Sequence, residues 1–281
     1  MKTPEFSNPP SAPRALYSIW KTLPASAKAR FQEVWYLKFT DPNEEKGMWI
    51  RFTLLCSGNG YRRIAETWAV IFDQGMHPRK FAVKQSFSID QFRLENGAIS
   101  IGPHSHLDLN GTQGKIESKG HVIRWDLKFT NTAPPVTFDA VPGTLRSLGF
   151  KTLHVDTLSE DLKVSGIVEI DGERWDWKQA SGMLAHHGGK NLGHSWAWGH
   201  CNQFIDEAGK PVDVIFEGLN AHAKIAGPLA SPALSSFLIQ YQGKRYQVDS
   251  LWNALRARSE NDFREWKFQW DTQDSSQKKK S

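Results

Sequence analysis

The run GIVEIDGERWDW, residues 166–177, joins two alternating segments through an Asp-Gly pair. Apolar residues alternate with polar ones before Asp171-Gly172 and again after it. Asp-Gly suits a two-residue type I′ turn, because both turn positions need a positive φ. The run therefore predicts an antiparallel β-hairpin, each strand of which has one apolar and one polar side.

The same period-two pattern recurs along most of the chain. It is present at residues 50–54, 81–89, 123–129 and 266–270, and Gln242-Gly243 predicts a second tight hairpin. Strands spaced by roughly ten residues are typical of a sandwich or barrel. A short helix is expected at 24–33, where Pro24 precedes helix-forming residues. The segment 248–258 stays open, although Leu251 and Leu255 lie at helical spacing.

The composition predicts a globular chain with an aromatic interior. Its 281 residues include 12 Trp and 16 Phe, and 39% are hydrophobic. Large rings suit the wide face of a curved sheet or a cavity for a flat apolar ligand. The length allows either one large domain or two domains of ordinary size.

Two related barrels fit the organisation of the chain better than one sheet. A Pro-rich break at 131–142 indicates a crossing between domains. The two halves also echo each other weakly, since Trp35-Tyr36 opens one strand and Trp196 opens a similar one, each followed by a polar turn with glycine.

Charge and hydropathy exclude several classes of protein. The net charge of +5 is modest, and Lys278, Lys279 and Lys280 supply three of these charges. No basic stripe marks a nucleic-acid partner. No apolar run is long enough to span a membrane, and no secretory signal or disulfide framework is expected. We expect a cytoplasmic protein, and the basic tail leaves contact with a membrane surface open.

The densest group of chemically useful residues lies at 186–202. Four of the ten histidines fall here, together with two Trp, two Asn and a Cys. In a strand, four side chains of this segment would share one face: Trp196, Trp198, His200 and Asn202. If that face is the barrel interior, it forms an aromatic wall with two polar groups, which could stack an apolar ring and protonate or orient it.

Simpler interpretations stand beside this one. The spacing of the His and Cys residues matches no standard zinc pattern, so no metal is expected. His200 and Cys201 would face opposite sides of a strand, which argues against a nucleophile pair. The Trp pair could be plain core. Glu66 and Glu217 lie beside apolar runs, where burial would raise the pKa of a carboxyl group toward the range of a general acid.

Three of these segments, together with the opening strand, resemble a known family. Residues 166–177, 196–204 and 243–246 follow the order of motifs found in the second domain of tocopherol cyclase-like proteins, and 34–38 resembles the family's opening strand. The same superfamily contains AttH-like proteins, carotenoid 1,2-hydratases and lipocalin-like Diels–Alderases. The likeness extends thinly over most of the chain and is specific at 166–246.

The resemblance implies an all-β fold of two tandem lipocalin-like antiparallel barrels with few short helices. We expect a flexible arm at 1–20, a first barrel at 21–140, a second barrel at 141–274 and a disordered basic tail at 275–281. Family enzymes protonate or template an isoprenoid or polyene without a cofactor. They usually carry an acidic residue, a basic or His residue and Asn in the loop before the Trp-x-Trp strand. Here that loop has Ala185, His186 and His187, so a carboxylate partner for His186 must come from elsewhere in the chain.

The sequence thus predicts a protein that binds an apolar small molecule in an aromatic-lined barrel pocket. The alternative is a cofactor-free cyclase, hydratase or isomerase that uses histidine as the acid. The candidate catalytic residues are His186, His187, Glu66 and Glu217. The candidate ligand-binding residues are Trp35, Tyr36, Trp68, Trp196, Trp198, His200 and Asn202.

Overall fold

The computed structural model describes residues 15–23, 30–58, 62–75, 78–131, 138–139, 154–190, 195–222, 224–226, 229–230, 232–248, 251–262 and 264–269. These residues fall into two compact units. The first unit holds the described residues up to Asp139 and those from His154 to Lys190, and the second holds those from Ser195 onward.

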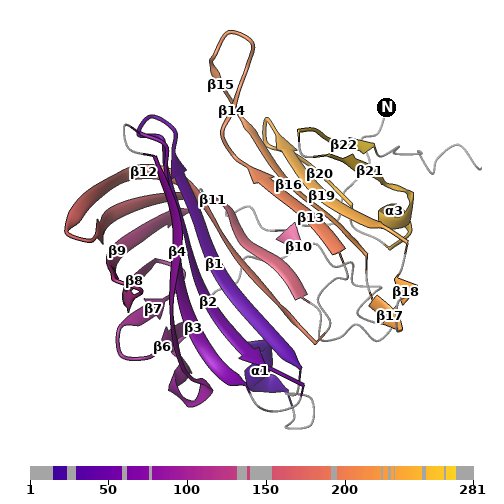
Figure 1. The fold of residues 1–281 in the computed structure, drawn as a ribbon. Coiled ribbons are helices and arrows are strands. Elements are labelled where there is room, and N and C mark those ends of the chain that lie inside the picture. Colours follow the sequence, from indigo (N-terminus) through magenta and orange to yellow (C-terminus); the bar gives the residue numbers. More distant parts are fainter. Residues whose placement is uncertain are drawn as a thin grey trace, which may run out of the picture. The chain divides into compact units, whose positions relative to one another are not determined.

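One long antiparallel sheet forms the first unit (Figure 1). Its strands follow the order β4-β3-β2-β1-β12-β11-β9-β8-β7-β6-β5, and β10 pairs with β11. The strands are β1 (Phe31–Asp41), β2 (Lys46–Cys56), β3 (Arg63–Asp73), β4 (Arg79–Ser88), β5 (Phe92–Glu95), β6 (Ala98–Ile101), β7 (Ser105–Leu107), β8 (Gly111–Ser118), β9 (His121–Asn131), β10 (Phe138–Asp139), β11 (His154–Ile170) and β12 (Glu173–Gly189).

The sheet curls until its far strands approach each other. The Phe81 ring of β4 stacks on the His121 ring of β9 with centroids 4.4 Å apart. Arg79 at the start of β4 forms an ion pair with Glu173 at the start of β12. The prediction of an all-β, antiparallel barrel fold with few short helices is confirmed.

The Asp171-Gly172 hairpin occupies the centre of this sheet. Asp171 and Gly172 have φ of 54° and 88°, so the expected turn is confirmed. Its strands β11 and β12 pair with β9 on one side and β1 on the other. Residues 154–189 therefore lie in the first unit, although they belong to the range 141–274 in which the sequence analysis expects a second barrel. Most of the expected crossing at 131–142 lies outside the described residues.

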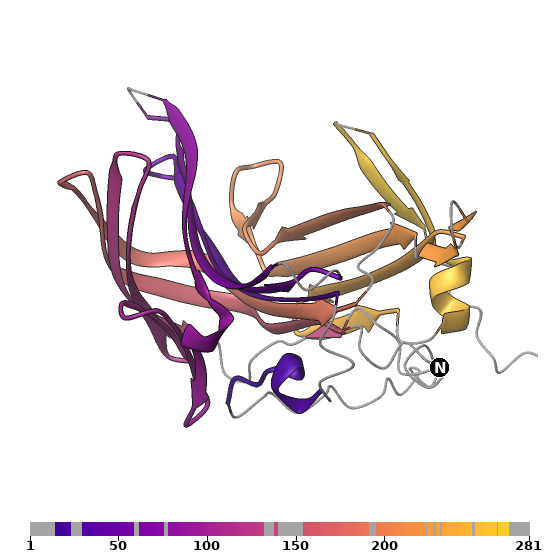
Figure 2. The same ribbon diagram turned by 60° about the horizontal axis from the view of Figure 1, so that its bottom comes forward.

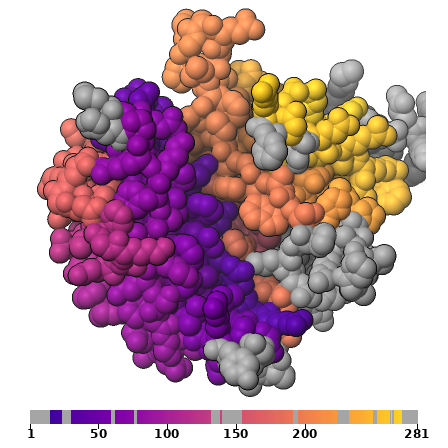
Figure 3. Space-filling model, in the orientation of Figure 1, coloured from indigo at the N-terminus to yellow at the C-terminus, as the bar shows by residue number. Residues whose placement is uncertain are grey.

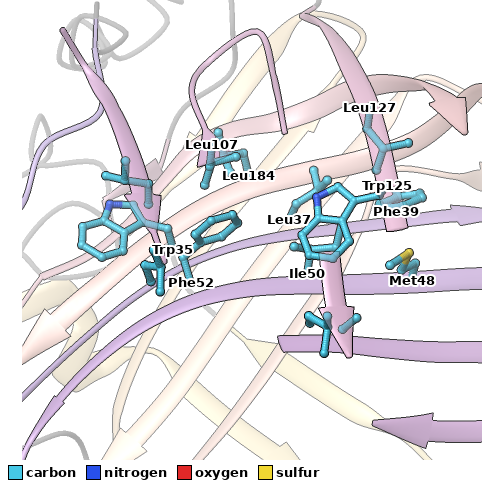
Figure 4. Packing of buried hydrophobic residues seen from close by; sticks show 14 of the residues in the cluster. Trp35, Leu37, Phe39, Met48, Ile50, Phe52, Leu107, Trp125, Leu127 and Leu184 are labelled. Carbon is cyan, nitrogen blue, oxygen red and sulfur yellow. The ribbon is translucent and has the colours of Figure 1, made fainter. Parts of the chain in front are cut away.

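Alternation along the strands builds the core of the first unit. Trp35, Leu37 and Phe39 of β1 are at most 1% exposed, and they point to the same side as Met48, Ile50 and Phe52 of β2 (Figure 4). Trp125 and Leu127 of β9 and Leu184 of β12 join them there. In the face that Figure 3 shows, side chains of this unit fill the spaces seen between the ribbons.

The first helix starts earlier in the chain than the sequence predicts. Helix α1 (Ile19–Thr22) follows Ser18, whose hydroxyl accepts a hydrogen bond from the Lys21 amide. Phe31 and Glu33, the end of the helix expected at 24–33, belong to β1, because they pair with β2 and β12. Residues 24–29 lie outside the described part. No described helix is long and apolar enough to cross a membrane.

The second unit contains a four-stranded antiparallel sheet in the order β13-β16-β19-β20 (Figure 1). Its core gathers around Phe237 and Val248. The positive φ of Gln242 and Gly243 confirms the second predicted hairpin, and α3 covers the segment that the sequence left open. The elements are β13 (Ser195–Cys201), β14 (Phe204–Ile205), β15 (Pro211–Val212), β16 (Val214–His222), β17 (Lys224–Ala226), β18 (Leu229–Ala230), β19 (Leu234–Tyr241), β20 (Lys244–Gln247), α3 (Leu251–Arg256), β21 (Arg258–Asn261) and β22 (Trp266–Gln269).

Gly166 should be the least replaceable glycine of the β11–β12 hairpin. It has φ of 140° at a register shift in β11, and an added Cβ would lie 2.1 Å from the Asp126 carbonyl oxygen. Gly166→Ala is therefore expected to destabilise the first unit by about 2 kcal/mol or more in urea denaturation. Gly172→Ala is the matched control, since it also puts alanine at a positive φ but its Cβ meets nothing within 4 Å, so its loss should be smaller. Equal losses for both variants would contradict this account.

Candidate functional site

The structure separates the predicted site residues into three groups. His186 and Trp35 lie on the inner face of the first unit's sheet. His187, Tyr36, Trp68 and Glu66 lie on its other face. The remaining residues belong to the second unit: Trp196, Trp198, His200, Asn202 and Glu217.

A buried acid–histidine pair forms the centre of the inner group. His186 Nε2 lies 2.8 Å from Glu33 Oε1, and both side chains are completely buried. Glu33 comes from β1, and His186 comes from β12 rather than from the loop that the sequence predicted. Pairing of Trp35 with His186, and of Glu33 with Gly188, brings the two side chains to neighbouring positions on one face. Glu33 thus supplies the carboxylate that the sequence around His186 lacks.

Aromatic rings enclose the imidazole of His186. The Trp35 ring stacks on it with centroids 4.9 Å apart and an interplanar angle of 3°. The Tyr17 ring meets it edge-on at 4.6 Å. Trp35 Nε1 also donates to the backbone carbonyl of Tyr17, which orients the indole ring.

A second polar pair lies next in the same row of the sheet. Asp156 of β11 pairs with His186 across the ladder, and its carboxylate accepts a hydrogen bond from the Tyr17 hydroxyl. His154 Nδ1 lies 3.5 Å from the same carboxylate oxygen of Asp156. The end of the sheet therefore carries two carboxylates and two histidines, with Tyr17 between them.

Glu33 also fastens the N-terminal segment to the sheet. Its carboxylate accepts hydrogen bonds from the Ser18 hydroxyl at 2.8 Å, the Ile19 amide at 2.6 Å and the Trp20 amide at 3.1 Å. These amides begin α1, which lies at the end of the sheet where β1 starts (Figure 2). Gly188 makes room for this arrangement, since a Cβ there would lie 3.1 Å from the Ile19 side chain.

One atom of this centre has no partner within the described part of the chain. Nδ1 of His186 is buried and makes no hydrogen bond there. Because Nε2 faces the Glu33 carboxylate, it carries the donated proton, which leaves Nδ1 as an acceptor in the neutral ring and a donor in the charged ring. Buried polar atoms are nearly always hydrogen-bonded, so this atom points to an interaction with a group outside the described part of the chain.

Glu66, on the other face, does not have the raised pKa that the sequence led us to expect. Burial alone would raise the pKa of this carboxyl, but hydrogen bonds from Lys84 and Ser86, each 2.7 Å long, outweigh it and lower the pKa. Trp68 Nε1 donates to the second oxygen at 3.0 Å. Glu66 is therefore a stably ionised carboxylate and not a proton donor near neutral pH.

His187 lies on the opposite side of β12 from His186. Its ring contacts the Tyr36 ring at 5.8 Å. Burial first, and then the neighbouring charges of His186 and Arg51, lower the pKa of His187 to about 3. The ring is therefore neutral at neutral pH and a poor proton donor.

The group in the second unit lacks a buried aromatic wall. Trp196 is 64% exposed, so the expected interior face is not closed around it. Trp198 Nε1 donates to the Glu217 carboxylate at 2.7 Å, and His200 lies opposite Glu217 in the β13–β16 ladder. Asn202 follows the end of β13. Among the described residues, no three His, Cys, Asp or Glu side chains gather to hold a metal ion.

The sequence interpretation missed Glu33, Tyr17 and Asp156. Glu33 precedes Trp35 by two residues in the same strand, and this spacing puts both side chains on one face. That signal was present in the sequence. The predicted hairpin pairs β11 with β12, but three register shifts separate its turn from Asp156, and no pattern predicted them or the pairing of β1 with β12. The sequence therefore did not join Glu33 or Asp156 to His186.

The Glu33–His186 interaction should be measurable as a coupling energy. In a double-mutant cycle with Glu33→Gln and His186→Gln, we expect about 1–3 kcal/mol of coupling in unfolding, because the pair is buried and hydrogen-bonded. The exposed pair Arg124–Glu169, 3.1 Å apart, is the control and should give below about 1 kcal/mol. A coupling no larger than that of the control would contradict a tight buried pair.

His187 should make the folded protein more sensitive to acid. Its folded pKa of about 3 lies below the ordinary 6.5, so the unfolded chain binds a proton first as the pH falls. Stability that is complete above pH 6.5 is then lost, by about 1 kcal/mol per pH unit, down to about pH 3. His187→Gln should flatten this slope between pH 7 and pH 5 in urea denaturation. Replacing the exposed His104 by Gln should not; an unchanged slope in His187→Gln would refute the assignment.

Comparison with known proteins identifies similar folds. No protein-family model and no curated protein matches the chain. A putative AttH protein from Nitrosomonas europaea has a similar structure, with a TM-score of 0.54, 12% identity, and coverage of 91% of this chain and 79% of that one. Kievitone hydratase from Nectria haematococca is also similar, with a TM-score of 0.48, 10% identity, and coverage of 92% of this chain and 78% of that one. CghA with Sch210972 has a TM-score of 0.48, 9% identity, and coverage of 77% of this chain and 59% of that one. The chain therefore has the fold of the AttH-like structure.

Proposed function

We propose that the first unit binds a largely apolar small molecule at the α1 end of its sheet, beside His186. The observation that carries this proposal is the buried Nδ1 of His186, which has no partner in the described part of the chain. Trp35 and Tyr17 give the position aromatic walls, and one polar atom among such walls is typical of sites for small apolar ligands. The ligand would offer His186 a hydroxyl or carbonyl group.

The end of the sheet at α1 is the part of this unit best suited to the ligand. The hollow formed partly by Phe39, Met48 and Phe72 lies at the opposite end of β1 from Glu33. At the α1 end, Tyr17 is only partly buried, and the segment before β1 covers the pair with a helix of four residues. Such a short segment can open locally at small cost, which gives a ligand a way in.

Acid–base catalysis at the same position is the second candidate, and the Glu33–His186 pair favours it. The carboxylate orients the imidazole and stabilises the imidazolium, while Nδ1 is directed to another partner. A charged His186 would then donate a proton through Nδ1 to an alkene or carbonyl of the ligand. The family resemblance supports a cofactor-free cyclisation, hydration or isomerisation. The pair also fits a protein that only binds its ligand. Three hydrogen bonds from Ser18, Ile19 and Trp20 to Glu33 hold the segment around α1 against the sheet, which is a structural role that needs no catalysis.

Native mass spectrometry with organic extraction tests the binding proposal. Protein purified from its own host is expected to carry an apolar compound, and His186→Gln should lower its occupancy severalfold through the lost hydrogen bond. His187→Gln is the matched control, because this neighbour faces the other side of β12. An empty wild-type protein, or equal occupancy in both variants, would overturn the proposed site.

The same two variants separate binding from catalysis. If the protein is an enzyme, the wild-type chain converts the extracted compound or its precursor. His186→Gln should then lower the turnover by 10²-fold or more while the variant still binds the compound. His187→Gln should keep its turnover. Retained binding with no turnover in the wild-type protein would identify a carrier.

A further inference from the structure

A different cluster lies on the other face of the same sheet. Three consecutive strands place Tyr36, Arg51 and Trp68 in one row, and Lys84 of β4 ends it. Trp49, two residues before Arg51 in β2, points to the same side. The cluster thus surrounds Arg51 with rings contributed by three strands.

Arg51 lies between two indole rings. Its guanidinium carbon is 5.3 Å from the centroid of the Trp49 ring and 5.6 Å from that of Trp68. Stacked aromatic faces hold the plane of a guanidinium but do not use its N–H groups. The N–H groups at the edge of the Arg51 guanidinium therefore remain available to a group that lies beside the two rings.

The hydrogen-bonding groups at this point are unsatisfied. Nε of Arg51 is buried and has no hydrogen-bond partner among the described residues, and the same holds for Trp49 Nε1 and Thr53 Oγ1. Glu66, a carboxylate whose charge acts on Arg51, already accepts hydrogen bonds from Lys84, Ser86 and Trp68. Three donors in one patch thus lack an acceptor. Buried cations and donors without partners are costly, and a fold rarely retains several together.

The charges of the patch fit an anionic acceptor. Lys84 and Glu66 form an ion pair at 2.7 Å, whereas Arg51 has no ion-pair partner among the described residues. The neighbouring His187 is neutral near pH 7 and adds no charge. Burial lowers the pKa of the Arg51 guanidinium, an effect that Tyr36 and Glu66 offset only in part, so an added negative charge would be favourable.

We propose that Arg51 forms a second ligand site, which binds the carboxylate of a planar aromatic or conjugated acid. A carboxylate can accept two parallel hydrogen bonds from the guanidinium fork, while Trp49 Nε1 and Thr53 Oγ1 supply further donors. The indole edges give the planar body of the acid an apolar surface. This site lies on the other side of the sheet from His186 and is independent of the proposed function.

Arg79 provides a matched control for Arg51. Its guanidinium carbon also lies 5.3 Å from an indole centroid, that of Trp175. Its Nε also makes no hydrogen bond among the described residues, but its charge is already neutralised by Asp73 at 3.3 Å and by Glu173. An arginine stacked on tryptophan but paired with carboxylates should not attract an acid.

Calorimetric titration of the full chain with 2-naphthoate and its neutral isostere 2-naphthamide tests the proposal. The wild-type protein should bind the acid about tenfold or more tightly than the amide, and Arg51→Met should abolish this preference. Arg51→Lys keeps the charge but not the fork and should reduce the preference severalfold. Arg79→Met and His186→Gln should leave the preference intact.

Several outcomes would overturn the assignment. Equal affinity of the wild-type protein for acid and amide removes the anion requirement, and a preference retained in Arg51→Met removes Arg51. Loss of the preference in His186→Gln alone would move the acid to the inner face. Competition by inorganic phosphate as strong as by benzoate would reduce the site to a nonspecific anion contact.

Arg51→Met should also unfold at a temperature no lower than the wild-type protein, because it removes an unpaired charge. Clear destabilisation of this variant would mark Arg51 as structural.

Discussion

Pairing of β12 with β1 is the contact on which the rest of the first unit depends. The β11–β12 hairpin satisfies the edge of β1 on one side and the edge of β9 on the other, which makes two meanders into one sheet. Without it, two long rows of backbone groups would be unpaired. The same ladder fixes the register that places His186 beside Trp35 and Gly188 beside Glu33. The fold and the candidate site therefore rest on one set of backbone hydrogen bonds.

Because side chains alternate across a strand, this one ladder serves two environments. His186 faces the packed interior and meets Glu33, whereas His187 faces the other side, near Tyr36 and Arg51. Neighbours in sequence thus lie in different electrostatic surroundings. The inner position holds an imidazole against a carboxylate, and the outer one keeps an imidazole neutral beside an arginine. A slip of one residue would exchange the two histidines and disrupt both clusters.

Two buried clusters of polar groups in the first unit cost stability, because burial removes these groups from water. Glu33, His186 and the donors around Arg51 are buried in a sheet that otherwise packs aromatic and aliphatic side chains. Replacing such groups by apolar ones is often neutral or stabilising, so packing does not require them. Their position at the end of β1 and around one arginine agrees with two separate binding functions, one on each face of the sheet.

The sequence by itself determined the local structure and the class of the fold. Period-two alternation and the Asp171-Gly172 and Gln242-Gly243 turns predicted the strands and hairpins, because these signals act within a few residues. It also marked His186 and Trp35 as candidate site residues. Only the tertiary structure decided that β12 lies against β1, that Glu33 is the partner of His186, and that Trp196 stays exposed. Alternation specifies which side of a strand is buried but not which strand lies next to it, and that choice brings distant charges together.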